Sequence, residues 1–241
     1  MKSIQLILIV LSALSGCTKK ADTALATNMN TTNTTTMTAT GSFTYLALGD
    51  SYTIGESVPQ AQSFPYQLTG LLNNSGLSVN SPALIATTGW TTDNLIAAIS
   101  QSNIHSNTYD FVTLLIGVND QYQGISQDNY KIKFAEVLGT AISFAKGDTS
   151  RVFVISIPDY GVTPFGQGRD DVIGPQIDQF NAINKSISLK AGVHYLNITD
   201  ISRQAATDLS LVAGDGLHPS AKMYALWVQQ LEQMVALRIK K

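Results

Sequence analysis

Short apolar runs alternate with longer segments of helical periodicity from residue 43 onwards. The apolar runs lie at 43–48, 83–86, 111–116, 152–157 and, more weakly, 194–198. Runs of this length that end near glycine or proline are typical of strands buried on both faces of a sheet. We therefore predict five strands in a sheet that is covered on both sides.

Apolar residues three or four positions apart mark the helices between these strands. Such stripes run from Phe134 to Ala145, from Ile173 to Ile187 and from Tyr224 to Val235. Ser220 could cap the last of these helices, and Asp93 lies near the start of another. Alternation of strands and helices predicts an α/β fold, a three-layer α/β/α sandwich with a central, mainly parallel sheet.

The first forty residues do not follow this pattern. Lys2 precedes an apolar run at 4–14, which is shorter than the roughly 20 residues that span a bilayer. This arrangement predicts a signal peptide over residues 1–16. The following Leu14-Ser15-Gly16-Cys17 resembles a bacterial lipobox, in which the cysteine is acylated. An ordinary signal peptide remains the alternative, but the chain's only cysteine occupies the position that lipidation requires.

Residues 17–40 are predicted to be a lipidated cysteine and a disordered, Thr-rich tether. Nine of the twenty residues from 21 to 40 are Thr, which leaves too few apolar side chains for a core. Residues 41–241 are predicted to form one domain. Thr18, in place of Asp, resembles lipoproteins sent to the outer membrane of diderm bacteria. We expect a cell-envelope protein anchored to a membrane by lipid, on the periplasmic or the surface face.

Charge and composition exclude several classes of function. The net charge of −2 offers no broad basic face for nucleic acid. One cysteine cannot form a disulfide framework, and the three histidines lie in no metal-ligand spacing. We expect no cofactor and no metal. The sequence makes no prediction of oligomeric state.

Polar segments follow the predicted strands or precede the last helix, at 49–51, 88–90, 117–120 and 215–219. Sites of parallel sheets gather beyond the carboxyl ends of the strands, so we expect these segments to meet. Ser51 is then a candidate nucleophile, with His218 as its base. Asp215, three residues before His218, could orient the imidazole. Taken singly, Asp215 could be a turn residue and His218 a helix cap.

Acyl transfer also needs donors for a developing oxyanion. The backbone N–H groups of Ser51 and Gly89 and the side-chain amide of Asn119 are the candidates, although Gly89 and Asn119 could each be plain turn residues. We interpret Asp50 and Asp120 as structural residues that bond nearby backbone N–H groups. His105 and His194 are assigned no role.

The four segments together resemble the conserved blocks of the SGNH, or GDSL-type, serine hydrolases. The resemblance extends from Gly41 to about Arg238, and Ser51, Gly89, Asn119 and His218 match the family residues in order. Asp215 matches the family's triad acid. The resemblance implies a flavodoxin-like three-layer fold and metal-free hydrolysis of carboxylic esters or thioesters. It therefore predicts an esterase or lipase that acts through an acyl-enzyme on Ser51.

Several alternatives stay open. The same site could transfer an acyl group to a sugar hydroxyl, or the chain could be a non-catalytic, lipid-anchored binding module. A flavin-binding relative is disfavoured, because the 49–52 turn is acidic and poor in glycine. Two loops, 121–130 and 159–168, should line the pocket with the aromatic residues Tyr122, Tyr130, Tyr160 and Phe165. Short acyl esters, lysophospholipids and acetylated carbohydrates are the candidate substrates.

Overall fold

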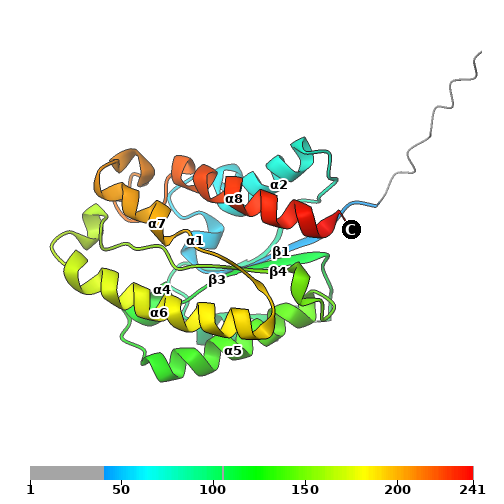
Figure 1. Ribbon diagram of the computed structural model, residues 1–241, viewed down its shortest axis with the longest axis horizontal. Helices are drawn as coiled ribbons and strands as arrows, with labels where there is room; N and C mark the ends of the chain where they lie inside the picture. Colours follow the sequence, from blue (N-terminus) through cyan, green and yellow to red (C-terminus); the bar gives the residue numbers. More distant parts are fainter. Residues whose placement is uncertain (1–40, 105, 241) are drawn as a thin grey trace, which may run out of the picture. The chain divides into compact units, whose positions relative to one another are not determined.

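A five-stranded parallel sheet forms the centre of the molecule (Figure 1). The computed structural model describes residues 41–104 and 106–240, so the predicted signal peptide, Cys17 and the tether lie outside the described residues. The strands follow the spatial order β2-β1-β3-β4-β5. They are β1 (Tyr45–Gly49), β2 (Ala83–Ala86), β3 (Phe111–Leu115), β4 (Val152–Ile155) and β5 (His194–Leu196). Each overlaps a predicted run, and every pairing is parallel, which confirms the predicted fold class.

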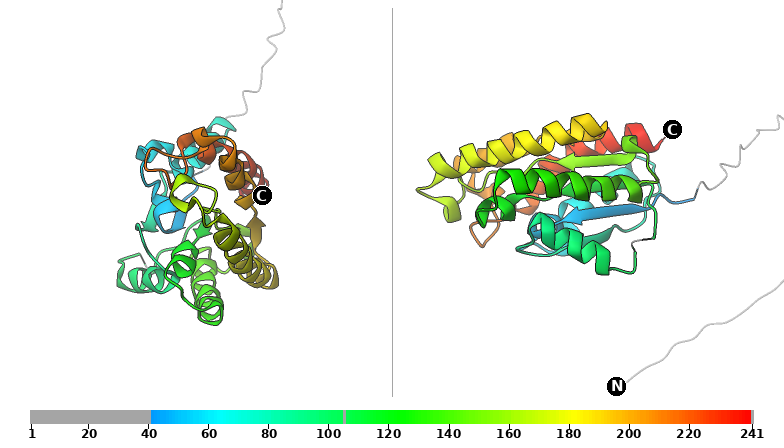
Figure 2. Two further views of the ribbon diagram at one scale, coloured as in Figure 1. Left: turned by 90° about the vertical axis from the view of Figure 1, so that its left-hand side faces the viewer. Right: turned by 90° about the horizontal axis from the view of Figure 1, so that it is seen from below.

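Helices cover both faces of this sheet. In Figure 1, α2 and α8 lie above the sheet and α5 and α6 lie below it. Figure 2 shows α5 and α6 side by side over the sheet, and α3 packs beside α5. The α-helices are α1 (Ser51–Ile54), α2 (Phe64–Asn74), α3 (Thr92–Gln101), α4 (Val118–Tyr122), α5 (Gln127–Phe144), α6 (Asp170–Ala191), α7 (Thr199–Ser202) and α8 (Ala221–Ile239). The three predicted stripes lie in α5, α6 and α8, and only Ala145, the C-cap of α5, falls outside its helix. Ser220 caps α8 by accepting from the Met223 N–H.

The position of each strand in the sheet explains how strongly apolar its sequence is. The central strands β1, β3 and β4 are buried along their whole length, whereas β2 and most of β5 are half-exposed edge strands. Across the two innermost strands, Tyr45 stacks on Phe111 with ring centroids 4.4 Å apart. The Tyr45 hydroxyl also bonds Thr113 Oγ1 at 2.8 Å. The strands that are buried along their whole length are therefore β1, β3 and β4, and the polar segments at 49–51 and 117–120 follow two of them.

Gly49 allows the chain to turn sharply from β1 into α1. A Cβ atom at this position would collide with the Thr53 side chain and with the carbonyl oxygen of Leu115 on β3. Only glycine permits α1 to sit this close to β3. Ser51 consequently becomes the first residue of α1, directly beyond the strand end.

The sheet order brings the polar loops to one edge. The chain passes from β1 to β2 on one side and then returns to β3 on the other side of β1. Gly49, the last residue of β1, is in register with Ala86 of β2 and Leu115 of β3. The loops after these strands therefore emerge together at a topological switch point, where α/β proteins bind ligands.

Candidate active site

Ser51 is the first residue of α1 and lies at a cavity at this switch point. Asp50 caps the helix, and its Oδ1 accepts a hydrogen bond from the Tyr52 N–H at 3.0 Å. This bond confirms the predicted use of Asp50 in the turn. Ser51 is only 4% exposed, yet it lines the cavity. The turn thus presents the Ser51 hydroxyl to the cavity.

Asp215 and His218 form a compact pair on the turn before α8. One carboxylate oxygen, Oδ1, accepts from the backbone N–H groups of Leu217 at 2.9 Å and His218 at 3.0 Å. The other, Oδ2, lies 2.6 Å from His218 Nδ1. The three-residue spacing therefore lets the carboxylate hold both the backbone and the ring of His218.

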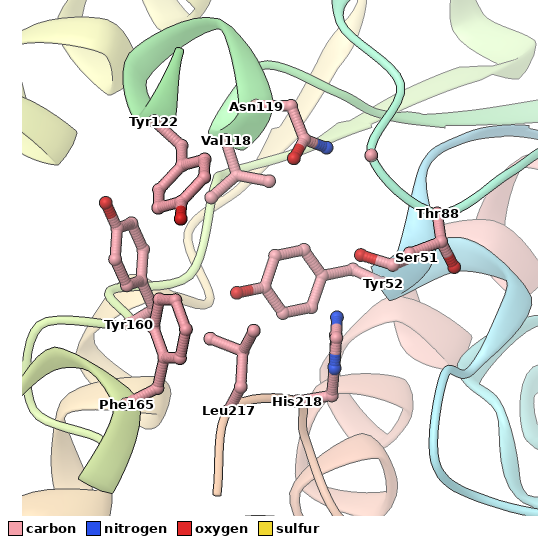
Figure 3. Close-up of a pocket in the computed structure, with 11 residues that line it drawn as sticks. Ser51, Tyr52, Thr88, Val118, Asn119, Tyr122, Tyr160, Phe165, Leu217 and His218 are labelled. Atoms are coloured by element: carbon pink, nitrogen blue, oxygen red, sulfur yellow. The ribbon is translucent and has the colours of Figure 1, made fainter. Parts of the chain in front are cut away.

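The environment of Asp215 keeps the carboxylate ionised. Burial by itself would raise the pKa of Asp215, but hydrogen bonds from Ser57, from His218 and from two backbone amides outweigh it and hold the pKa well below its usual range. With Nδ1 on Asp215, the other ring nitrogen is turned toward Ser51 (Figure 3). The His218 ring packs edge-on against Tyr52 at 5.5 Å between centroids, which fixes its tilt.

Gly89 and Asn119 line the same cavity as Ser51 and His218. Gly89 has a φ of +82°, a conformation that favours glycine, although space around its Cα is open. The side chain of Asn119 donates one N–H to the Trp90 carbonyl oxygen at 3.0 Å, which fixes the orientation of the amide. An amide has a second N–H to offer.

The loop that carries Gly89 is held from both sides. The Thr88 hydroxyl donates to the Glu56 carboxylate, and Gln123 Nε2 donates to the Gly89 carbonyl oxygen at 3.2 Å. Both partners come from segments that adjoin the cavity, after α1 and after α4. The loop therefore has a fixed position relative to Ser51, as a preorganised donor site requires.

The cavity has a volume of about 200 Å³ and brings the predicted residues together. Ser51, Gly89, Asn119 and His218 line it, and Asp215 lies behind His218. Tyr122, Tyr160 and Phe165 form an aromatic wall, with ring centroids 6.1–6.2 Å apart. The remaining lining residues are Tyr52, Thr88, Val118 and Leu217. Sequence reasoning missed these four, although each is a direct neighbour of a predicted site residue.

One predicted wall residue, Tyr130, lies elsewhere. It is fully buried on α5, and its hydroxyl donates to the Ile116 carbonyl oxygen at 3.3 Å. Most of the predicted loop 121–130 is helical, because α4 extends to Tyr122 and α5 begins at Gln127. The helix turns Tyr130 into the core, where it packs against Phe134 and Phe180. The prediction that Tyr130 lines the pocket is therefore wrong.

The other polar residues that the sequence singled out have structural contacts. Asp120 accepts from the N–H and the hydroxyl of Thr92, at 2.9 and 3.0 Å, and so joins α4 to α3. Asp93 lies in the first turn of α3, as expected, and pairs with Lys133 at 3.1 Å. His194 lies in β5, and His105 lies outside the described residues.

Within residues 41–104 and 106–240, no helix is both long enough and apolar enough to span a membrane. The same part of the chain contains no cluster of three or more His, Cys, Asp or Glu residues that could hold a metal ion.

A sequence model of the GDSL-like lipase/acylhydrolase family matches residues 47–226. The chain belongs to this family. The resemblance to the SGNH, or GDSL, hydrolases is confirmed, and the five residues predicted for the triad and the oxyanion hole lie within the matched segment. Membership makes the protein a hydrolase whose general activity is ester hydrolysis.

Solved structures of GDSL-family and other esterases share the fold. Axe2, an acetylxylan esterase from Geobacillus stearothermophilus, aligns with a TM-score of 0.62 and 17% identity over 81% of this chain and 95% of its own. The esterase EstA from Pseudoalteromonas sp. aligns with a TM-score of 0.57 and 18% identity over 83% and 100%. TesA aligns with a TM-score of 0.61 and 14% identity over 80% and 97%. No curated protein sequence matches this GDSL-family chain.

Proposed function

We propose that this protein is a serine esterase that hydrolyses carboxylic esters through an acyl-enzyme on Ser51. The observation that carries the proposal is the His218–Asp215 pair, with Nδ1 and Oδ2 2.6 Å apart and the ring turned toward Ser51 in one cavity. A hydroxyl group is a weak nucleophile unless a base removes its proton, and this ring is placed to do so.

In the first half-reaction, Ser51 Oγ attacks the ester carbonyl carbon and transfers its proton to the free ring nitrogen of His218. The carbonyl π electrons move onto oxygen, and the oxyanion accepts from the N–H groups of Ser51 and Gly89 and from the Asn119 amide. As the carbonyl reforms, the bond to the alcohol breaks. The departing alcohol takes the proton from His218, which leaves an ester on Ser51.

In the second half-reaction, water replaces the alcohol. His218 removes a proton from the water as its oxygen attacks the acyl carbon, and the same donors hold the second oxyanion. Collapse expels Ser51 Oγ, which recovers its proton from His218, and the carboxylic acid leaves. A sugar hydroxyl in place of water would give acyl transfer by the same steps, so product analysis with an added sugar acceptor separates the two reactions.

The cavity favours substrates with a short acyl group. Its volume of about 200 Å³ is below the roughly 300–1,000 Å³ of pockets that enclose drug-sized ligands. A long acyl chain would therefore extend beyond it. At the rim, the rings of Tyr122 and Phe165 are 54% and 43% exposed. Exposed aromatic faces can stack on sugar rings. We propose an acetylated carbohydrate or another short acyl ester in preference to a lysophospholipid.

A series of p-nitrophenyl esters, from acetate to palmitate, tests the proposal. We expect kcat/KM to be highest for acetate and butyrate, and to fall for longer chains. Ser51→Ala should lower kcat by about 10⁴-fold or more while the circular dichroism spectrum is retained. Ser75→Ala is the matched control, because this serine bonds Glu232 at 2.8 Å and has no contact with the site.

Two results would contradict the proposal. Equal, negligible rates for the native protein and Ser51→Ala, with no labelling of Ser51 by a fluorophosphonate, would favour the binding-module alternative. Highest activity on palmitate would retain the esterase but reject the short-acyl assignment. We further propose that acylated Cys17 anchors the enzyme in the cell envelope, a proposal that rests on the sequence of residues 1–18.

A further inference from the structure

The three residues after α1 connect the nucleophile turn to both neighbouring loops of the site. The N–H groups of Gly55 and Glu56 donate to the Ser51 carbonyl oxygen at 3.1 and 3.0 Å. The Glu56 carboxylate accepts from Thr88, next to Gly89. Ser57 Oγ donates to Asp215 Oδ2 at 2.6 Å. This segment, 55–57, is therefore bonded to the nucleophile residue, to the Gly89 loop and to the acid.

Ser57 has a backbone conformation that serine rarely adopts. Its φ is +65°, in the left-handed region. A non-glycine residue in this region is sterically strained, and such residues concentrate at functional sites. Glycine would take up the same φ without strain but has no hydroxyl to donate. The strained backbone and the short bond to Asp215 therefore point to a use for this particular side chain.

We propose that Ser57 is a positioning residue for the Asp215–His218 pair, an inference that rests on the proposed function. Asp215 Oδ2 accepts from Ser57 and from His218 Nδ1 at the same time, each at 2.6 Å. The second donor prevents the carboxylate from rotating and so holds the plane of the ring. It also draws charge from Oδ2, which limits how strongly Asp215 favours the protonated imidazole.

Loss of the Ser57 hydroxyl should therefore have two consequences. His218 would be less well oriented toward Ser51, which lowers kcat. The carboxylate would also favour the protonated ring more strongly, so a higher pH would be needed to form the free base. Other titratable groups around the pair are Tyr52 from α1, Asp50 and Glu56 on either side of α1, Tyr224 from α8, and Asp159 and Tyr160 after β4. Substitution of Ser57 leaves all six in place.

Two variants separate the effect of the Ser57 hydroxyl from the effect of its strained backbone. Ser57→Ala removes the hydroxyl and keeps the strained φ, whereas Ser57→Gly removes both. In each full-length variant, we expect kcat to fall roughly 3- to 30-fold on p-nitrophenyl acetate. The acid limb of kcat/KM against pH should move up by about 0.5 units in both. The Gly variant should melt at a higher temperature than the Ala variant. Ser75→Ala should change neither kcat nor the acid limb.

A measurement that needs no turnover accompanies the kinetics. The ring signals of His218, assigned by comparison with His218→Gln, are titrated by NMR in the native protein and both Ser57 variants. We expect the midpoint of the His218 titration to move up by about 0.5 pH units in both variants. An unchanged midpoint would overturn the role of Ser57 even if Ser51-dependent hydrolysis is observed. A shift in Ser57→Ala but not in Ser57→Gly would mean that backbone strain, and not loss of the hydroxyl, moves the midpoint. This result would also overturn the role of Ser57.

The same data distinguish the two proposals. A shifted midpoint without Ser51-dependent hydrolysis would support the Ser57–Asp215–His218 coupling and reject the proposed esterase. An unshifted midpoint with hydrolysis would retain the esterase and reject the coupling.

Discussion

Asp50, the residue before the proposed nucleophile, is a fully buried carboxyl group. Its Oδ1 accepts from the Tyr52 N–H, whereas Oδ2 has no hydrogen-bond partner. Burial is the main cause that raises the pKa of Asp50 to about 8, and the Asp120 carboxylate adds to the rise. The folded protein therefore carries a protonated Asp50 at neutral pH, one residue from Ser51. The sequence interpretation of Asp50 as structural did not anticipate this proton.

The proton on Asp50 decides whether the stability of the folded protein rises or falls with pH. Between about pH 4 and pH 8 the folded state holds a proton on Asp50 that the unfolded state has released, so stability falls as the pH rises through this window. Asp50→Asn cannot ionise. We expect its free energy of unfolding, relative to the native protein, to increase by up to about 1.4 kcal/mol per pH unit between pH 5 and 8. Urea denaturation at four pH values measures this difference.

Asp208→Asn is the matched control for this experiment. The side chain of Asp208 is 43% exposed, and hydrogen bonds from Lys222 and Ser210 lower its pKa to about 2. Its contribution to stability is therefore lost only as the pH falls below about 4, so Asp208→Asn should differ from the native protein by a constant amount between pH 5 and 8. A flat difference for Asp50→Asn as well would mean that Asp50 is ionised in the folded protein.

At the scale of elements, the close approach of β1, α1 and β3 sets the position of the proposed nucleophile. A Cβ at Gly49 would meet the Leu115 carbonyl oxygen, which cannot move without disturbing β3. A Cβ at Gly139, within α5, would meet no atom within 4 Å. The same substitution at these two glycines therefore tests whether the close approach, and not glycine in general, matters.

Gly49→Ala should lower the free energy of unfolding by roughly 2–4 kcal/mol, because overpacking displaces α1 or β3. Gly139→Ala should raise it by about 0.5–1 kcal/mol, because alanine is the better helix former and restricts the unfolded chain. Chemical denaturation followed by circular dichroism measures both. Gly49→Ala with native stability would show that α1 can shift without cost, and Ser51 would then lack the fixed position that the mechanism requires.

At the scale of the whole molecule, periodicity predicted the layers better than it predicted individual side-chain positions. The five strands and the long helices α5, α6 and α8 carry sustained apolar patterns, which made them predictable. The helix α2 did not stand out, because its buried positions include Pro65 and Thr69 among the apolar residues. The prediction for Tyr130 was wrong because the sequence does not show whether an aromatic residue lies in a loop that lines the pocket or on the buried face of a helix.

The predicted site residues could be brought together because parallel strands place their carboxyl ends at one edge. Asp215 and His218 lie more than 160 residues from Ser51 in sequence, yet the family's blocks identify them. The contact of Ser57 with Asp215 could not be predicted in this way. It depends on a positive φ at a serine, which no apolar pattern or turn motif encodes.

The predicted lipid on Cys17 would anchor the whole chain to a membrane. Full-length protein, expressed in a diderm bacterium, should carry acyl chains on Cys17 and sediment with the outer membrane. Each buried methylene contributes about 0.8 kcal/mol, so several chains anchor a protein firmly. Cys17→Ser should instead yield protein in the soluble fraction. Thr18→Asp should keep the acyl chains but move the protein to the inner membrane, if the residue after the cysteine directs sorting as the resemblance implies.

Activity on a soluble ester separates anchoring from catalysis. Every residue assigned to the reaction lies between Ser51 and His218, so all three proteins should hydrolyse p-nitrophenyl acetate with the same kcat/KM. Cys17→Ser that still sediments with membranes would reject the lipid anchor and leave the esterase proposal intact. A fall in kcat/KM for Cys17→Ser would instead mean that residues before 41 act on the site, since the substitution leaves residues 41–241 unchanged.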